Sequence, residues 1–246
     1  MKIFNRQRNL ALKTQRIRRY LLYAMGEIIL VVVGIVIGLQ VNNWNEQNTR
    51  QQKINTYYER IHEEVDFSIQ HIEYNTQFSD SLIAGLTYCL ESIAAKEVDS
   101  TFVQHLAYLT DNEQQTFFFP VIDEFMELGY LSSVEDLALR EQFKLLAYFR
   151  KQSAVDDVNI QTFSERLLKP TLVDKLNYLD IDFMHRHKAY PNPLRFTNDP
   201  ENDYQQLAED LELWNLIIYR IDIEKNRIIN NDQLINVLKN IQQKVG

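Results

Sequence analysis

Residues 20–41 read YLLYAMGEIILVVVGIVIGLQV, an apolar run in which Glu27 is the single charged residue. As a helix this run would cover roughly 33 Å, enough for the about 30 Å of a bilayer's hydrocarbon core. Tyr20 and Tyr23 stand at one end and Trp44 at the other, where amphipathic rings prefer the membrane interface. The run therefore predicts one transmembrane helix over residues 20–41.

The charge on either side of this run predicts its orientation. Residues 1–19 carry seven Lys or Arg and no acid. The positive-inside rule places such a tail in the cytoplasm, where it also attracts anionic membrane lipid. We therefore expect residues 1–19 in the cytoplasm and residues 42–246 on the outer side of the membrane. A cleaved signal peptide, hinted at by Arg18-Arg19, fits less well, because the run is long and no small-residue cleavage site follows it.

The predicted outer domain, residues 42–246, is acidic and lacks disulfides. It holds 19 basic and 33 acidic residues, a net charge of −14. Such a charge repels nucleic acid and anionic membrane surfaces, which argues against both as partners of this domain. Cys89 is the one cysteine, so no intrachain disulfide can form. Stability must come from packing, for which about 205 residues suffice.

Scarcity of glycine predicts long helices in this domain, since only Gly85 and Gly129 precede the final residue there. Apolar residues at 3–4 spacing run from Ile54 to Ile72, weaken at Asn75 and Ser79, and resume from Leu82 to Ile93. This pattern indicates one long helix or two stacked segments, which could continue the span directly.

Proline, glycine and helix-capping residues predict the shorter elements that follow. We expect a helix after Pro120 that ends at Gly129, and a capping box at Ser132–Glu135 that opens a helix to about Lys151. Shorter helices are expected over Val155–Leu168 and Leu172–Leu179, with a proline-containing loop over Tyr190–Pro200.

The C-terminal segment predicts a last helix of about forty residues, opened by Asp199-Pro200. Its apolar residues recur every seven positions: Leu207, Trp214, Ile221, Ile228 and Ile235. The fold class is therefore all-α: a single N-terminal transmembrane helix, then an antiparallel helical bundle whose long first and last helices pack together. Coiled-coil pairing between protomers is the alternative, although charged residues at the partner positions disfavour it.

Two segments resemble a known family: YLLYAMGEIILVVVGIVIGLQVNNWNE at Tyr20–Glu46, and FFFPVIDEFMELGYLSSVEDLALREQFKLLAYFR at Phe117–Arg150. They are similar to a family of uncharacterised single-pass inner-membrane proteins of Bacteroidetes with the pattern YLLYAxGEIxLVVxGIxIxLQxNNWNE. The first match is nearly letter for letter, and the second is looser. The resemblance implies the same topology and domain extent: a bacterial inner-membrane protein with residues 1–19 cytoplasmic and residues 42–246 periplasmic. It implies no mechanism.

Glu27 is the most informative single residue of the span. A charged group within hydrocarbon costs about 3 kcal/mol unless it is protonated, paired or facing protein. At 3.6 residues per turn, Gly34 and Gly38 lie within about 20° of Glu27 on a helix. Small residues at this GxxxG spacing permit close helix approach. We expect this face to mediate self-association or binding to another membrane protein. The alternatives are snorkelling of Glu27 toward Arg18 or Arg19, and a proton-relay role.

Candidates for enzymatic or metal chemistry are sparse. The nearest cluster is Asp180, Asp182, His185 and His187, which meets no established metal-ligand spacing. His62 stands on a charged helix face and is expected to be exposed. With no nucleophile-elbow, phosphate-loop or dinucleotide motif present, we expect no catalytic residues and no cofactor.

The aromatic run Phe117–Phe119, with Phe125 and Tyr130 after it, is expected to be core. Its alternative is an exposed patch that docks a partner or lines a pocket.

Together these features favour a non-enzymatic scaffold or accessory subunit that presents a helical domain for protein–protein interaction. The second hypothesis is a periplasmic ligand-sensing bundle, which would signal through a partner membrane protein because nineteen cytoplasmic residues cannot house a transmitter. The third is an enzyme or metal-binding protein that uses His185 and His187.

Overall fold

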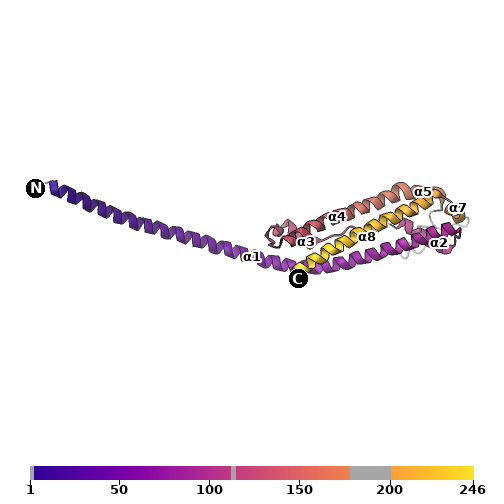
Figure 1. Ribbon diagram of the computed structural model, residues 1–246, viewed down its shortest axis with the longest axis horizontal. Coiled ribbons are helices and arrows are strands. Elements are labelled where there is room, and N and C mark those ends of the chain that lie inside the picture. The colour runs from indigo at the N-terminus through magenta and orange to yellow at the C-terminus, as the bar shows by residue number, and fades with distance from the viewer. Residues whose placement is uncertain (1–2, 112–114, 178–200) are drawn as a thin grey trace. The chain divides into compact units, whose positions relative to one another are not determined.

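The computed structural model is all-helical in the residues that it describes, 3–111, 115–177 and 201–246, with side chains from Tyr20 onward except Leu21 (Figure 1). The chain divides into two units, Met1–Thr56 and Tyr57–Gly246. The elements in chain order are α1 (Ile3–Ala95), α2 (Ser100–Leu106), η1 (Ala107–Thr110), α3 (Pro120–Glu127), η2 (Tyr130–Ser133), α4 (Leu137–Phe163), η3 (Ser164–Leu168), α5 (Lys169–Lys175), α7 (Tyr204–Ala208) and α8 (Leu211–Val245).

The first unit is helical from Ile3 and carries the apolar run. From Leu22 to Val41 every side chain is exposed apart from half-buried Ala24. By length and composition this is the one described helix able to cross a membrane, a test that a signal sequence also passes. The predicted apolar N-terminal helix is confirmed.

The second unit is built on α8, which runs antiparallel to residues 57–95 of α1. Side-chain contacts fix the direction: Asp66 meets Gln242, whereas Ser79 meets Glu224. Since one residue number rises as the other falls, the two helices point in opposite directions. The predicted packing of the long first and last helices is confirmed.

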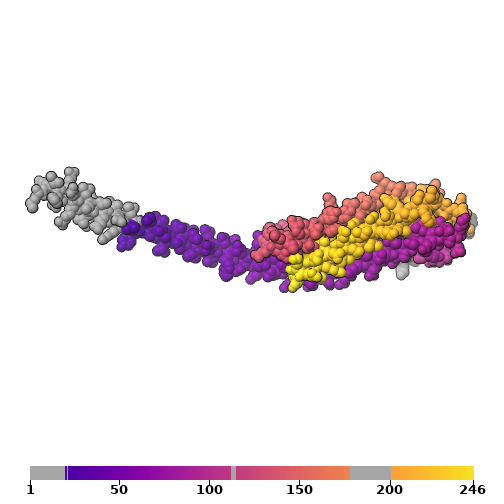
Figure 2. All heavy atoms as spheres, in the orientation of Figure 1, coloured from indigo at the N-terminus to yellow at the C-terminus, as the bar shows by residue number. Residues whose placement is uncertain are grey.

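Helix α4 packs along the other side of α8, also antiparallel to it (Figure 2). Asp136 at the start of α4 pairs with Lys244 near the end of α8, and Asp156 meets Asn230 further back along α8. Helix α8 therefore lies between α1 and α4.

The heptad-spaced residues of the C-terminal segment face the interior of this unit. Leu207, Ile221 and Ile235 are buried, and Trp214 and Ile228 are half-buried. This apolar face is thus used within the chain, which removes the reason to expect a coiled coil between protomers. The predicted single last helix is wrong in one respect: Asp210 caps a new helix, so α7 and α8 are separate.

The aromatic run forms an extended segment whose residues alternate between interior and solvent. Gln115, Phe117 and Phe119 are buried, while Thr116 and Phe118 are exposed. Phe125 is also buried and Tyr130 is half-buried, so the predicted core role holds for all but Phe118, which is 78% exposed.

A carboxylate from α1 caps the next helix, α3. Glu64 accepts hydrogen bonds from the main-chain N–H groups of Val121 and Ile122, at 2.8 and 3.0 Å. These groups have no partner inside their own helix, so the contact ties α3 to α1. At the other end Gly129 adopts φ +72°, the left-handed conformation that ends a helix, as predicted.

The predicted capping box at Ser132–Glu135 is wrong. Residues 130–133 form η2, and Asp136 is the N-cap of α4, accepting from the N–H groups of Ala138 and Leu139. Aspartate is as good a cap as serine, and here it also binds Lys244 of α8.

The predicted break between residues 151 and 155 is also absent, because α4 continues to Phe163. The helical path then widens into the π-turn η3 before α5 begins. Pro170 supplies the reason: it has no N–H, so the carbonyl of Arg166 loses its normal donor four residues on. The predicted loop at Tyr190–Pro200 lies outside the described residues.

Candidate functional site

Glu27, Gly34 and Gly38 all lie in α1, so the helical periodicity that places them on one face holds. A methyl group built on either glycine would meet no described atom within 4 Å, and Glu27 is exposed. The anchors Tyr20, Tyr23 and Trp44 are exposed as well. Within the chain this face is therefore open to a neighbour, and no described contact identifies one.

The weak candidate cluster Asp180, Asp182, His185 and His187 lies outside the described residues. Among the residues that are described, no group of three or more His, Cys, Asp or Glu side chains is arranged to hold a metal ion. His62 is exposed, as predicted.

The most conspicuous polar feature of the second unit is a buried ionic cluster centred on Glu224 of α8. Its Oε1 lies 3.0 Å from Arg220 Nη2 and 3.1 Å from Arg227 Nη1, and its Oε2 accepts a 2.6 Å hydrogen bond from Ser79 of α1. The three charged side chains are at most 3% exposed. Buried charges are stable only when paired and hydrogen-bonded in this way.

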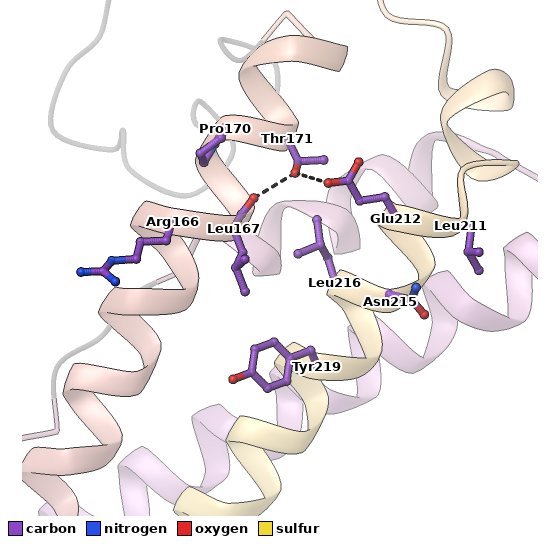
Figure 3. A pocket seen from close by; sticks show the side chains of 9 residues that line it. All are labelled: Arg166, Leu167, Pro170, Thr171, Leu211, Glu212, Asn215, Leu216 and Tyr219. Carbon is purple, nitrogen blue, oxygen red and sulfur yellow. Dashed lines mark hydrogen bonds between the residues drawn. The ribbon is translucent and has the colours of Figure 1, made fainter.

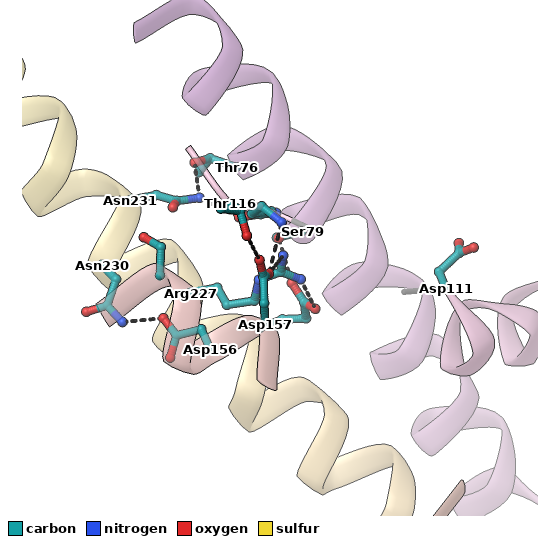
Figure 4. Close-up of polar contacts among 12 residues, drawn as sticks. Thr76, Ser79, Asp111, Thr116, Asp156, Asp157, Arg227, Asn230 and Asn231 are labelled. Atoms are coloured by element: carbon teal, nitrogen blue, oxygen red, sulfur yellow. Dashed lines mark hydrogen bonds and ion pairs between the residues drawn. The ribbon is translucent and has the colours of Figure 1, made fainter. Parts of the chain in front are cut away.

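The cluster extends to α4 through Asp157 (Figure 4). Arg227 Nη2 lies 3.4 Å from Asp157 Oδ1, and the same carboxylate accepts from the main-chain N–H of Gln115 and the hydroxyl of Thr116. Asn231 continues the contacts, donating to the side chains of Gln115 and Thr76. The polar interior thus links α1, α4, α8 and the extended segment.

Burial shapes the acid–base properties of this cluster. It lowers the pKa of the Arg220 guanidinium, an effect that Glu224 opposes. It raises the pKa of the Asp156 carboxyl, against the hydrogen bond from Asn230. Arg220 also donates to the main-chain carbonyl of Asp111 at 2.6 Å, whereas its Nε and Nη1 find no hydrogen-bond partner among the described residues.

The contacts of this cluster between helices hold those helices in register. Because its charged groups are closed to solvent, they offer no surface to a substrate. Sequence reasoning missed it, although a signal was present. Arg220, Glu224 and Arg227 are spaced i, i+4 and i+7, and they occupy the same stripe of α8 as buried Leu213 and Leu234. Three charges in an apolar stripe predict a buried pair or an interface.

A surface groove of about 770 Å³ lies at the end of this unit where α5 meets the start of α8 (Figure 3). Its walls are largely apolar and comprise Leu167, Pro170, Leu211, Leu216 and Tyr219. The sequence did not predict this groove, because its two walls lie about forty residues apart in the chain and the π-turn that shapes one of them has no simple sequence pattern.

Polar contacts fix the two walls of the groove to each other. The Thr171 hydroxyl lies 2.9 Å from the Leu167 carbonyl and 2.8 Å from Glu212 Oε1. Lys175 pairs with Glu212 Oε2 at 2.6 Å and with Asp210. The groove is consequently a preformed feature of the fold.

No protein-family model matches this chain, and no curated protein or solved structure matches it either. The resemblance to single-pass inner-membrane proteins therefore stays a prediction that rests on the two segments quoted above.

Proposed function

We propose that this chain is a non-enzymatic scaffold or accessory subunit of a bacterial inner membrane. Residues 20–41 anchor it, residues 1–19 face the cytoplasm, and residues 42–246 present an acidic helical domain to the periplasm for protein–protein interaction. The observation that carries the proposal is the open face of α1 formed by Glu27, Gly34 and Gly38.

Energetics favour a partner for that face. A charged residue at the centre of a span costs about 2.5–3.5 kcal/mol on insertion scales. Glu27 lies inside the apolar run, so a hydrogen-bonding neighbour would stabilise the protein. Gly34 and Gly38 leave room for a second helix to approach closely. Lipid provides no hydrophobic driving force between helices, so close van der Waals packing at such glycines is what favours their association. The neighbour is either a second copy of this span or the span of another membrane protein.

The test is purification of the full-length protein at native abundance in mild detergent, with the mass and subunit composition of the particle determined. We expect a stoichiometric second subunit or a homo-oligomer in the wild type, lost in Glu27→Gln and in Gly34→Leu. Val36→Leu is the matched control, because Val36 lies on the opposite side of the helix from Glu27. A monomer in every case would refute the proposal.

Orientation is tested separately with Gln47→Cys and Lys13→Cys variants in intact cells. A membrane-impermeant maleimide that crosses the outer membrane should label the first and spare the second. The reverse pattern would overturn the proposed topology.

A further inference from the structure

We propose that the groove between η3–α5 and α8 binds an anionic amphiphile, an acyl chain with a carboxylate or phosphate headgroup. Its volume of about 770 Å³ lies within the range of small-molecule sites, and such sites are mostly apolar with a few polar groups. This ligand site goes beyond the scaffold role and stands or falls independently of it.

Exposed apolar side chains gather along this groove. Leu211 is 71% exposed, Tyr219 47% and Leu167 45%. Single exposed apolar residues are ordinary, but a contiguous set that lines a concave surface marks a place where an apolar group binds. Covering them removes apolar area from water, which is the main driving force for an acyl chain to enter.

The shape of the groove is fixed by the helix geometry of one wall and by polar contacts between the two walls. Pro170 and the π-turn before it widen the helical path, and π-turns occur frequently at functional sites. The contacts of Glu212 with Lys175 and Thr171 lock α5 onto the start of α8. A ligand therefore meets a groove that needs no costly rearrangement.

Charge selects the headgroup. Glu212 also lines the groove, but its carboxylate is paired with Lys175. Arg166 takes part in no ion pair within the described parts of the chain, and its side chain extends outward from the edge of the groove, away from the apolar lining, where the head of a bound amphiphile would emerge (Figure 3). Residues 42–246 carry a net charge of −14, so a guanidinium without an ion-pair partner among the described residues is one of few groups there that could attract an anion. Arginine binds carboxylate and phosphate bidentately, so an anionic head at this rim completes the site.

The length of the groove favours an acyl chain over a partner helix. From Leu211 to Tyr219 the α8 wall covers about 12 Å, little more than two turns. The residues flanking it are Asp210 on one side and, as the next exposed position on the other, Asp222. A docked amphipathic helix needs an apolar track that continues past these points.

The experiment is photo-crosslinking of the full-length protein in lipid nanodiscs. One sample receives a diazirine-bearing palmitic acid, and a second is built with a phospholipid that carries the same diazirine-bearing chain. After irradiation, labelled peptides are mapped by mass spectrometry. We expect label at Leu167 and Leu211, in addition to label in residues 20–41, which reports simple partition into the bilayer.

Variants establish specificity. Leu211→Glu should abolish groove labelling, and Arg166→Gln should reduce it severalfold. On the wild-type protein, replacing the acid probe by its methyl ester should also reduce groove labelling severalfold. Leu137→Glu is the matched control. Leu137 is about as exposed, at 69%, but it is the first residue of α4, whereas the groove lies beyond the last residue of that helix. It should label like the wild type.

Each outcome decides the matter. Groove label from the free acid supports a fatty-acid-like ligand, and groove label only from the phospholipid supports a membrane lipid as its source. Label confined to residues 20–41, or groove label that survives Leu211→Glu, overturns the proposal. Groove label indifferent to both Arg166→Gln and the methyl ester overturns the assignment of an anionic head.

Discussion

Replacing Glu224 with leucine is expected to destabilise the helical bundle by about 3–5 kcal/mol, the cost of breaking a buried ion pair from one side. Glu224 accepts hydrogen bonds from Arg227 and Ser79 and forms an ion pair with Arg220. Two hydrogen bonds to a charged group would sum to roughly 3–6 kcal/mol, and the loss stays below the upper figure because Arg227 keeps Asp157 and leucine fills part of the vacated volume. Arg220 would be left buried without its closest counter-charge.

The assay is thermal unfolding of the full-length protein in detergent, followed by circular dichroism. For a unit of 190 residues, each kcal/mol shifts Tm by about 2–4 °C, so a fall of roughly 6–20 °C is expected. Ser79→Ala removes one of the two hydrogen bonds to Glu224 and should cost about 1.5–3 kcal/mol. Lys225→Leu, on the exposed side of α8, is the control and should stay within about 0.5 kcal/mol of wild type.

The double variant Arg220→Leu/Glu224→Leu tests the reasoning most directly. Replacing both members of a buried pair by apolar groups is often nearly neutral, so the double variant should be less destabilised than the two single variants added together. Strict additivity, or a cost below about 1 kcal/mol for Glu224→Leu alone, would refute the idea that these charges depend on each other.

Three further predictions concern single sites. Gly85→Ala usually gains about 0.5–1 kcal/mol of helix propensity, but here the new Cβ would stand 2.6 Å from the Tyr108 ring, so urea unfolding should show a net loss of about 1–2 kcal/mol. Lys244 and the cap contacts of α4 hold the pKa of the Asp136 carboxyl below its usual value. The contribution of Asp136 to stability is therefore present above about pH 4 and is lost as pH falls through the folded-state pKa. Asp136→Asn should flatten the dependence of Tm on pH in that acid range, and an unchanged profile would contradict this role of Asp136. Burial raises the pKa of the Cys89 thiol to about 12, so a maleimide should modify it only after unfolding, whereas stoichiometric labelling of the native protein would contradict its buried position.

Local patterns predicted several elements correctly because their causes are local. The length and apolarity of residues 20–41 require only helical rise, and the stop at Gly129 requires only a residue that tolerates positive φ. The apolar 3–4 spacing along α1 likewise identified buried Ile61, Val65 and Leu86. These features depend on a few neighbouring residues.

Features that depend on distant residues were mispredicted or missed. The weakening of the apolar pattern at Asn75 and Ser79 left open whether one long helix or two stacked segments follow the span. Helix α1 runs unbroken through both residues, which are buried, and Ser79 binds Glu224 from 145 positions away. The N-cap of α4 is Asp136, whose carboxylate also binds Lys244, 108 positions further along the chain, and this second contact could not be read from the local sequence.

The sequence by itself determined the helical class, the apolar segment and its charged flank, because each follows from composition and periodicity. Only the tertiary structure decided where polar side chains meet and where a groove opens. Glu224, Arg220 and Arg227 become a buried cluster when α1 and α4 close over α8, and Arg166 gains an apolar neighbourhood when the π-turn at η3 sets α5 against α8. Pairing of charges and shape of surface are properties of two or more packed elements, so no single stretch of sequence contains them.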